Sequence, residues 1–368
     1  MNSGIRWARF SNPLRFKFKH ASANRAESSS IIVELVSGSC RGYGEACPRP
    51  YVTGETEASV IACLEQNGKD WLHSISSIDA LRERLQAEKE LVDRNPAAYA
   101  ALEMASLDLL GQKQGCSVES LLGLSSLAEN IKYSAVVGDG SPLKTRVQSL
   151  IYRAAGFTDF KVKIGRDINR DKLRFRSLPS NIRLRVDANN LFSMVEDCSN
   201  HLKTLDRDIW AVEEPFKAGD VDSQSELVQA MKVRVILDES LLRKEQLALY
   251  EDSSFKWIAN IRVSKSGGIL RSIDLARAAQ AQGMDVILGA HVGETSILSR
   301  AALTVGQALV DPPLAREGAF GRILVTRDIC NPSLRFGIGG MWSAARWKFS
   351  EKSGLGLSIQ PEAIFCDK

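Results

Sequence analysis

Hydrophobic positions follow two different periods in the first third of the chain. Residues 28–38, SSSIIVELVSG, alternate apolar and polar side chains as a half-buried strand does. Residues 96–111, PAAYAALEMASLDLLG, begin with proline, carry apolar residues at helical spacing and end in glycine, which predicts a buried helix. Residues 1–127 are therefore expected to form an α+β domain.

From about residue 128 the pattern changes to short apolar runs separated by helical segments. Strands are expected at residues 131–137, 159–165, 182–190, 208–216, 234–240, 259–268, 284–291 and 313–320. Eight such strands alternating with helices predict an α/β fold, a (β/α)8-type barrel over residues 128–340, with parallel strands joined by crossover helices. Residues 353–364, SGLGLSIQPEAI, return to strand-like alternation, and residues 341–368 are expected to rejoin residues 1–127 in one capping domain.

A polar residue closes six of these strands at nearly constant spacing. The six are Lys163, Asp187, Glu213, Asp238, Lys265 and His291, and successive separations are 24, 26, 25, 27 and 26 residues. One strand, one helix and two loops take about 25 residues, so these groups are expected at the same end of every strand. In a barrel that end is the catalytic face, whereas a doubly wound sheet would not gather six strand ends around one centre.

Three of the six are acids on neighbouring strands, in the segments VDANN, VEEPF and LDES. Convergent buried carboxylates repel one another and raise their own pKa values unless a cation neutralises them. Oxygen ligands without cysteine favour Mg²⁺, and Mn²⁺ could take its place. Asp187, Glu213 and Asp238 are the predicted metal ligands, and the alternative is that they are helix N-caps or loop acids.

Three lysines are candidates for proton transfer. Lys161 and Lys163 are two residues apart on one strand and so share a face, where one positive charge lowers the pKa of the other. Lys265 lies four units further along and is expected across the barrel, so that the two sides of a substrate carbon would each face a lysine. The alternatives are a solvated strand end for Lys161 and Lys163, and an anion-binding loop for Lys265 with its following glycines.

Composition and charge narrow the function further. Hydrophobic residues make up 44% of 368, the formal net charge is +4, and no dense basic run suggests nucleic acid as a partner. Seven scattered cysteines without a CxxC pair are typical of reduced thiols, and no apolar run is long enough for a membrane span, so a cytoplasmic location is expected. The sequence leaves a homo-oligomer open.

The ordered set KVK, DAN, EEP, DES and SKSGG resembles the enolase superfamily, in its muconate lactonizing enzyme subgroup. The resemblance extends to GYGEACPRPYVTGET and ALEMASLDLLG, which are similar to that family's N-terminal capping domain, and to SGLGLSI near the C-terminus. It implies a magnesium enzyme that removes the proton next to a substrate carboxylate through an enediolate, with Lys163 and Lys265 as acid and base and Lys161 steering the carboxylate. Asn189 would support the metal site.

The same resemblance implies where substrate specificity lies. Glu294, in AHVGETS, resembles an acid at the end of the seventh strand that contacts substrate, and His291 is a second candidate, although a lone histidine is more often structural. The capping segments 20–27 and 48–56 are expected to cover the barrel mouth, where Arg25 could pair with a distal carboxylate rather than remain solvated.

Several reactions fit these motifs. PYVTGET is similar to a loop of dipeptide epimerases, but LAREGAFG lacks the DxD pair with which those enzymes hold a substrate ammonium. We expect a racemase or epimerase of an amino-acid derivative or dipeptide. A muconate-type cycloisomerase, an o-succinylbenzoate synthase-like lyase and a barrel that binds metal and carboxylate without turnover are alternatives. A nicotinamide dehydrogenase is disfavoured because no GxGxxG follows an early strand.

Overall fold

The computed structural model describes residues 3–20, 23–252, 255 and 257–365, and it begins with a three-stranded antiparallel sheet. The sheet has the order β1 (Ser3–His20), β2 (Ala23–Ser37) and β3 (Cys40–Ala46). Gly42 and Gly44 of β3 face the long helix α5 (Pro96–Gln114), where a Cβ would lie 2.0 Å from Ala105 O and 1.9 Å from Ala101 O. Only glycine permits this close approach of helix and strand.

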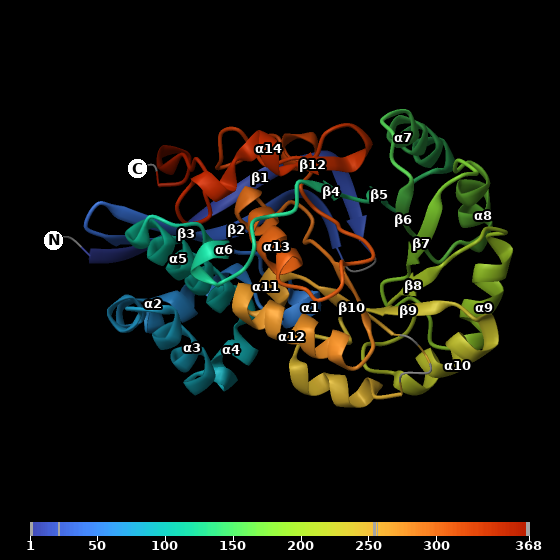
Figure 1. Ribbon diagram of the computed structural model, residues 1–368. Coiled ribbons are helices and arrows are strands. Elements are labelled where there is room, and N and C mark those ends of the chain that lie inside the picture. Colours follow the sequence, from blue (N-terminus) through green and yellow to red (C-terminus); the bar gives the residue numbers. More distant parts are fainter. Residues whose placement is uncertain (1–2, 21–22, 253–254, 256, 366–368) are drawn as a thin grey trace.

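The helices of the N-terminal part are α1 (Pro50–Thr53), α2 (Glu57–Ser74), α3 (Ile78–Ala87), α4 (Lys89–Arg94), α5 and α6 (Val118–Leu121). Of these, α2 and α5 contact the strands of the sheet, and α3, α4 and α6 pack against α5 (Figure 1). The predicted helix at 96–111 is confirmed as α5, with proline in its first turn and Gly115 at its C-cap in the left-handed region, φ 66°. Its residues from Pro96 to Gly111 are all buried.

The second part of the chain contains a curled sheet of seven parallel strands. In order they are β5 (Ala135–Val137), β6 (Asp159–Lys163), β7 (Arg183–Asp187), β8 (Ala211–Glu213), β9 (Arg234–Leu237), β10 (Ile258–Ile261) and β11 (Asp285–Leu288). Helices on the outside connect them: α7 (Pro142–Ala154), α8 (Ile168–Arg176), α9 (Val195–Thr204), α10 (Val221–Met231), the 3-10 helix η1 (Lys244–Tyr250), α11 (Val263–Ser266), α12 (Ile269–Ala281) and α13 (Ser296–Gln307). Figure 1 shows the strands side by side with this outer layer around them.

The eighth predicted strand, 313–320, is wrong as a regular strand. Gly318 and Ala319 have positive φ values of 100° and 52°, which bend the chain out of the extended conformation. The segment nevertheless lies in the corresponding place. Leu314 N and Glu317 N donate to carbonyls of β11, and Arg316 O accepts from Ser134 N, just before β5.

The C-terminal region returns to the N-terminal part without forming the expected tail strand. Its regular elements are η3 (Gly321–Ile323), η4 (Ile338–Gly340), β12 (Met341–Ser343), α14 (Ala344–Trp347), η5 (Phe349–Glu351) and η6 (Pro361–Ala363). Strand β12 pairs with β4 (Asn130–Lys132). Gly354 forms only an isolated bridge to Ser117, and Leu355 N donates to Asp108 Oδ1 of α5 at 2.7 Å.

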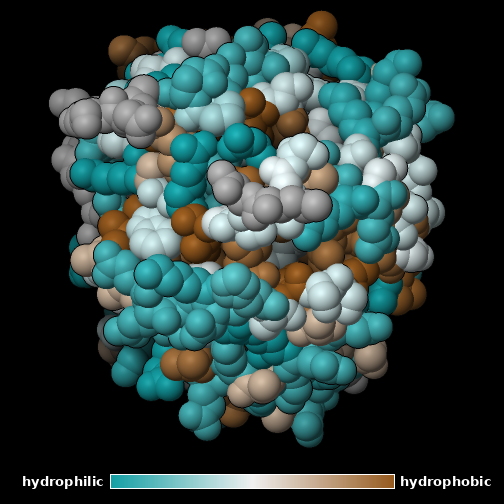
Figure 2. All heavy atoms as spheres, turned by 90° about the vertical axis from the view of Figure 1, so that its left-hand side faces the viewer, coloured by the Kyte–Doolittle hydropathy of each residue, from teal (hydrophilic) through white to brown (hydrophobic). Residues whose placement is uncertain are grey.

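The hydropathy of the surface agrees with the composition of the chain, in which hydrophobic and charged residues are balanced. The side of the molecule that carries both termini is mainly hydrophilic, with hydrophobic side chains in small groups (Figure 2). In the part of the chain that the structure describes, no helix is long and apolar enough to cross a membrane. Six cysteines are free thiols in that part, and Cys366 lies outside it.

Candidate active site

Three predicted site residues end neighbouring strands at the same level. Lys163 is the last residue of β6 and pairs in register with Asp187, the last residue of β7, which in turn pairs with Glu213, the last residue of β8. Asp238 directly follows β9. Neighbouring parallel strands are about 4.8 Å apart, so register alone brings these side chains together.

Lys161 holds three carboxylates from three different strands and loops. Its ammonium nitrogen lies 2.8 Å from Glu213 Oε1, 3.1 Å from Asp187 Oδ2 and 3.1 Å from Glu317. Burial alone would lower the pKa of Lys161, but the three carboxylates outweigh it and raise the pKa above its ordinary value. Lys161 therefore carries a permanent positive charge, which suits it to attract a carboxylate rather than to accept a proton.

Lys163 contacts the carboxylate of Asp187, which stays ionised although it is buried. Its ammonium nitrogen is 2.7 Å from both Asp187 Oδ2 and Asn189 Oδ1. Burial works against the charge of Asp187, yet Lys161 and Lys163 overcome it and hold the pKa of that carboxyl below its usual range. Asn189 and Asn190 adopt left-handed φ values of 47° and 58°, a local strain that persists where the surrounding structure enforces it.

Lys265 does not have the surroundings expected of an accessible base. It lies on the short helix α11, not on β10, and its side chain is fully buried. The ammonium group donates to Asp238 O at 2.8 Å, Asn260 O at 2.8 Å and Asp238 Oδ1 at 3.0 Å, which uses all three of its protons. In this arrangement Lys265 positions Asp238.

Arg262 reaches the site from the end of β10, a position that sequence analysis missed. It directly follows Ile261 and lies 24 residues after Asp238, within the spacing range of the other strand ends. Its Nη2 bonds Asp238 Oδ2 and lies 3.5 Å from Glu213 Oε1. Lys265, at 27 residues after Asp238, stands four positions beyond Ile261, the last residue of the strand, whereas Arg262 follows it directly.

Two other missed residues complete the network. Glu317, from the irregular eighth segment, accepts from Arg185 Nη2 at 2.9 Å as well as from Lys161. Asn260 of β10 is fully buried and donates through Nδ2 to Glu213 Oε1 at 3.1 Å. The direction of both side chains toward the site depends on how the sheet curls, so no local sequence pattern indicated them.

The carboxylates match the donor chemistry of a hard divalent ion. Glu213 is buried, its Oε2 has no described hydrogen-bond partner, and burial together with Asp187, Glu317 and Asp238 raises its pKa to about 8 despite Lys161. The positive charge around Glu213 is therefore too small to keep its carboxyl group ionised, and a bound cation would supply more. No three His, Cys, Asp or Glu side chains among residues 3–20, 23–252, 255 and 257–365 are grouped closely enough to hold a metal as they stand. Lys161 and Arg262 each lie between two of the carboxylates.

The predicted substrate-binding residues lie at the loop after β11, apart from Arg25. Glu294 accepts from His291 N at 3.1 Å and Ser299 Oγ at 3.3 Å, and burial, followed by Glu45, raises its pKa to about 8. His291 is buried. The segment 48–56 reaches this loop, because Arg49 Nη2 donates to Val292 O at 2.9 Å. Arg25 belongs to β2, but its side chain lies outside the described residues.

Comparison with protein families matches both parts of the chain. Residues 5–123 match the mandelate racemase / muconate lactonizing enzyme N-terminal domain, and residues 144–363 match the enolase C-terminal domain-like family. This chain belongs to the mandelate racemase / muconate lactonizing enzyme family. The predicted membership of the enolase superfamily is thereby confirmed, and its relatives indicate that the chain is an enzyme.

Relatives within the family are epimerases, racemases and cycloisomerases. The chain is 30% identical to an L-Lys-D/L-Arg epimerase of Methylococcus capsulatus over 94% of this chain and 95% of that protein. A structure of dipeptide epimerase from Methylococcus capsulatus complexed with Mg and the dipeptide L-Arg-D-Lys has a TM-score of 0.81 and 26% identity, over 98% of this chain and 100% of that one. The fold of 2-chloromuconate cycloisomerase from Rhodococcus opacus is also similar, with a TM-score of 0.86, 21% identity and coverage of 98% and 97%.

Proposed function

We propose that this protein is a magnesium-dependent isomerase that removes a proton from the carbon next to a substrate carboxylate, and that its substrate is an amino-acid derivative or dipeptide which it racemises or epimerises. The observation that carries the proposal is the group of Lys161, Lys163 and Asp187 on two adjacent strands, in which both ammonium groups contact the Asp187 carboxylate. The named epimerases among its relatives support the substrate class.

The chemistry follows from the different surroundings of the two lysines. Lys161, held by three carboxylates, stays charged and would attract the substrate carboxylate. The side chain of Lys163 is 10% exposed, against 3% for Lys161, so Lys163 is the group that could accept the proton from the α-carbon. We further propose that the seven strands and residues 314–317 together form the wall of a (β/α)8-type barrel with residues 1–127 and 341–368 as its cap.

Magnesium would be held by Asp187, Glu213 and Asp238. The free Glu213 Oε2 and the oxygen-only donor set support this assignment. When bound, the ion supplies positive charge that stabilises the negative charge developing on the substrate carboxylate. Arg262 would exchange its contact with Asp238 for one with the substrate, since guanidinium groups bind carboxylates in a planar, two-bonded arrangement.

A specific observation supports a second candidate, a reaction on one face of the α-carbon. Racemisation needs a proton donor on each face, and the ammonium of Lys265 is bonded to two backbone carbonyls and to Asp238. Arg262 stands at the equivalent strand end, and a guanidinium does not deprotonate in proteins. A cycloisomerisation or an elimination with Lys163 as the single base fits this arrangement.

Deuterium exchange separates the two candidates. Dipeptides, N-acylamino acids and cycloalkene carboxylates would be incubated with the enzyme and Mg²⁺ in D₂O and followed by mass spectrometry. Uptake of deuterium at the α-carbon of both enantiomers, lost in Lys163→Ala, is the result expected of a racemase or epimerase. Exchange of one enantiomer only, or conversion without exchange, would establish the one-face reaction. Saturable Mg²⁺-dependent ligand binding with neither exchange nor conversion across the library would favour the non-catalytic alternative.

Magnesium is expected to stabilise the folded protein. At about a hundred times its dissociation constant, a ligand of the native state contributes about 2.7 kcal/mol, which corresponds to a Tm rise of about 3–4 °C for a chain of this size. Glu213→Gln should abolish the rise without lowering the metal-free Tm, because the amide removes a repelling buried carboxylate. Differential scanning fluorimetry with EDTA and with added MgCl₂ measures both. Glu226→Gln, an exposed site on α10, is the control, and an unchanged rise in Glu213→Gln would refute the ligand assignment.

A further inference from the structure

A cavity of about 750 Å³ lies between the N-terminal helices and the outer helices of the second part, and none of the metal ligands or lysines of the candidate active site lines it. Residues of α3 and α4 form one wall, and residues of η1, α11 and α12 form the other. Nothing in the proposed reaction uses this cavity. Pockets of about 300–1,000 Å³ at the junction of two structural units are typical binding sites for small molecules.

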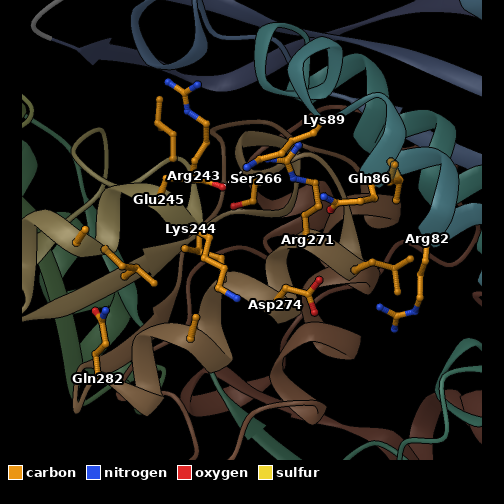
Figure 3. A pocket seen from close by; sticks show the side chains of 17 residues that line it. Arg82, Gln86, Lys89, Arg243, Lys244, Glu245, Ser266, Arg271, Asp274 and Gln282 are labelled. Carbon is orange, nitrogen blue, oxygen red and sulfur yellow. Dashed lines mark hydrogen bonds and ion pairs between the residues drawn. The ribbon is translucent and has the colours of Figure 1, made fainter.

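Positive charge dominates the wall of the cavity. Five basic side chains line it against two acidic ones, Glu245 and Asp274, and the basic set is Arg82, Lys89, Arg243, Lys244 and Arg271. Figure 3 shows Lys89, Arg243 and Arg271 around Ser266, and Arg82 and Lys244 on two sides of Asp274. Among the described residues, neither Arg82 nor Lys244 forms a hydrogen bond or ion pair. This excess of donors favours an anionic ligand.

Two buried donors in the wall lack an acceptor. Ser266 is 3% exposed, and its hydroxyl oxygen has no hydrogen-bond partner among the described residues. Arg271 binds Asp93 through Nη2, but its Nη1 is buried and also without a described partner. Leaving a buried polar group unsatisfied is unfavourable, so both atoms favour a hydrogen-bond acceptor from outside the part of the chain that the structure describes.

Part of the wall is apolar. Leu85 of α3, Leu247 of η1 and Leu270 and Leu275 of α12 line the same cavity, so the basic groups border hydrophobic side chains. An inorganic anion would satisfy the basic groups alone. A ligand with an anionic head and an apolar body would use both surfaces.

We propose that this cavity binds an amphipathic anion, a phosphate or carboxylate joined to an apolar group, with Ser266 and Arg271 donating to its anionic head. The short helix α11 links this cavity to the candidate active site. Its last residue, Ser266, lines the cavity, and the preceding Lys265 donates to Asp238. The cavity is separate from the proposed metal ligands, so it can be tested without magnesium.

Isothermal titration calorimetry of the full chain in EDTA, with phenyl phosphate as the probe, tests the site. Phenyl phosphate is expected to bind with one-to-one stoichiometry and about tenfold more tightly than inorganic phosphate, because burial of the ring adds to the binding of the head group. Ser266→Ala should weaken phenyl phosphate binding about tenfold through the loss of one hydrogen bond to a charged group. Lys244→Gln, an exposed change that leaves the packing intact, should weaken it about threefold.

Arg153→Gln, an exposed arginine on α7 far along the chain from the cavity wall, serves as the matched control and should bind as the unaltered chain does. Absence of saturable binding up to about 10 mM phenyl phosphate, weaker than typical metabolite affinities, would overturn the proposal. Equal affinities for phenyl phosphate and inorganic phosphate would refute the amphipathic class. Unchanged binding in both Ser266→Ala and Lys244→Gln would show that the anion binds outside this cavity.

Discussion

Replacing Lys163 by alanine is expected to lower kcat by about a thousandfold, because a positioned general base contributes about 10²–10⁴ to the rate. Lys163 lies 2.7 Å from Asp187 Oδ2 and Asn189 Oδ1 at the end of β6. Loss of the amine removes the proposed proton acceptor but leaves Lys161 to bind the carboxylate. The Michaelis constant should therefore change much less than kcat, and steady-state kinetics on a substrate found by the exchange screen measure both.

Two control variants accompany this experiment, one at an exposed lysine and one that keeps the positive charge at position 163. Lys203→Ala, at an exposed position on α9, should leave both constants unchanged. Lys163→Arg keeps the charge beside Asp187 but cannot accept a proton, so it should be as inactive as Lys163→Ala. Activity retained in Lys163→Arg would show that charge alone matters at this position and would remove Lys163 as the base.

Replacing Arg300 by alanine is expected to destabilise the protein by about 3–5 kcal/mol, the cost of leaving one partner of a buried ion pair alone. Arg300 of α13 is fully buried and bonds Glu119 of α6 twice, at 2.8 and 2.7 Å. It also donates to Leu355 O of the C-terminal region at 2.9 Å. One side chain thus joins three distant segments, and urea unfolding followed by tryptophan fluorescence measures its contribution.

A double variant identifies the origin of that loss. Arg300→Met with Glu119→Leu removes both charges and should be markedly more stable than Arg300→Ala, because no buried charge is left unpaired. Burial opposes the ionised form of Glu119, but Arg300 outweighs it and lowers the pKa of Glu119. The stabilisation is therefore present above the ordinary carboxyl pKa of about 4.3 and is lost as the pH falls through the lowered pKa of the folded state. An equal loss of stability in the unaltered chain and the double variant, as the pH is lowered from about 5 to about 2, would contradict this role.

The alternation of strands and helices could be predicted from the sequence because each strand shows the same pattern, an apolar run that ends in a polar residue. That repeat located Lys163, Asp187, Glu213 and Asp238, whose side chains the structure brings into one network. The period carried this information, because each repeat contributes one parallel strand whose carboxyl end lies at the same edge of the sheet.

The position of Lys265 could not be read in the same way. The segment 259–268 has the apolar content of a strand, yet the strand ends at Ile261 and α11 follows. Gly267 and Gly268 adopt φ values of 90° and 121°, which end that helix and turn the chain into α12. Since helix and strand differ here by hydrogen bonds and packing rather than by composition, Arg262 and not Lys265 occupies the strand end.

The sequence by itself determined the family, the parallel strands and the acids at their ends, because these depend on periodicity and on short ordered motifs. Only the tertiary structure decided that Glu317 and Asn260 join the site, that Lys265 is bonded to backbone carbonyls, and that unsatisfied donors line a cavity between α3, α4 and α12. These features depend on which side chains meet across long sequence separations. The direction and burial of a side chain follow from the packing around it, which no local pattern encodes.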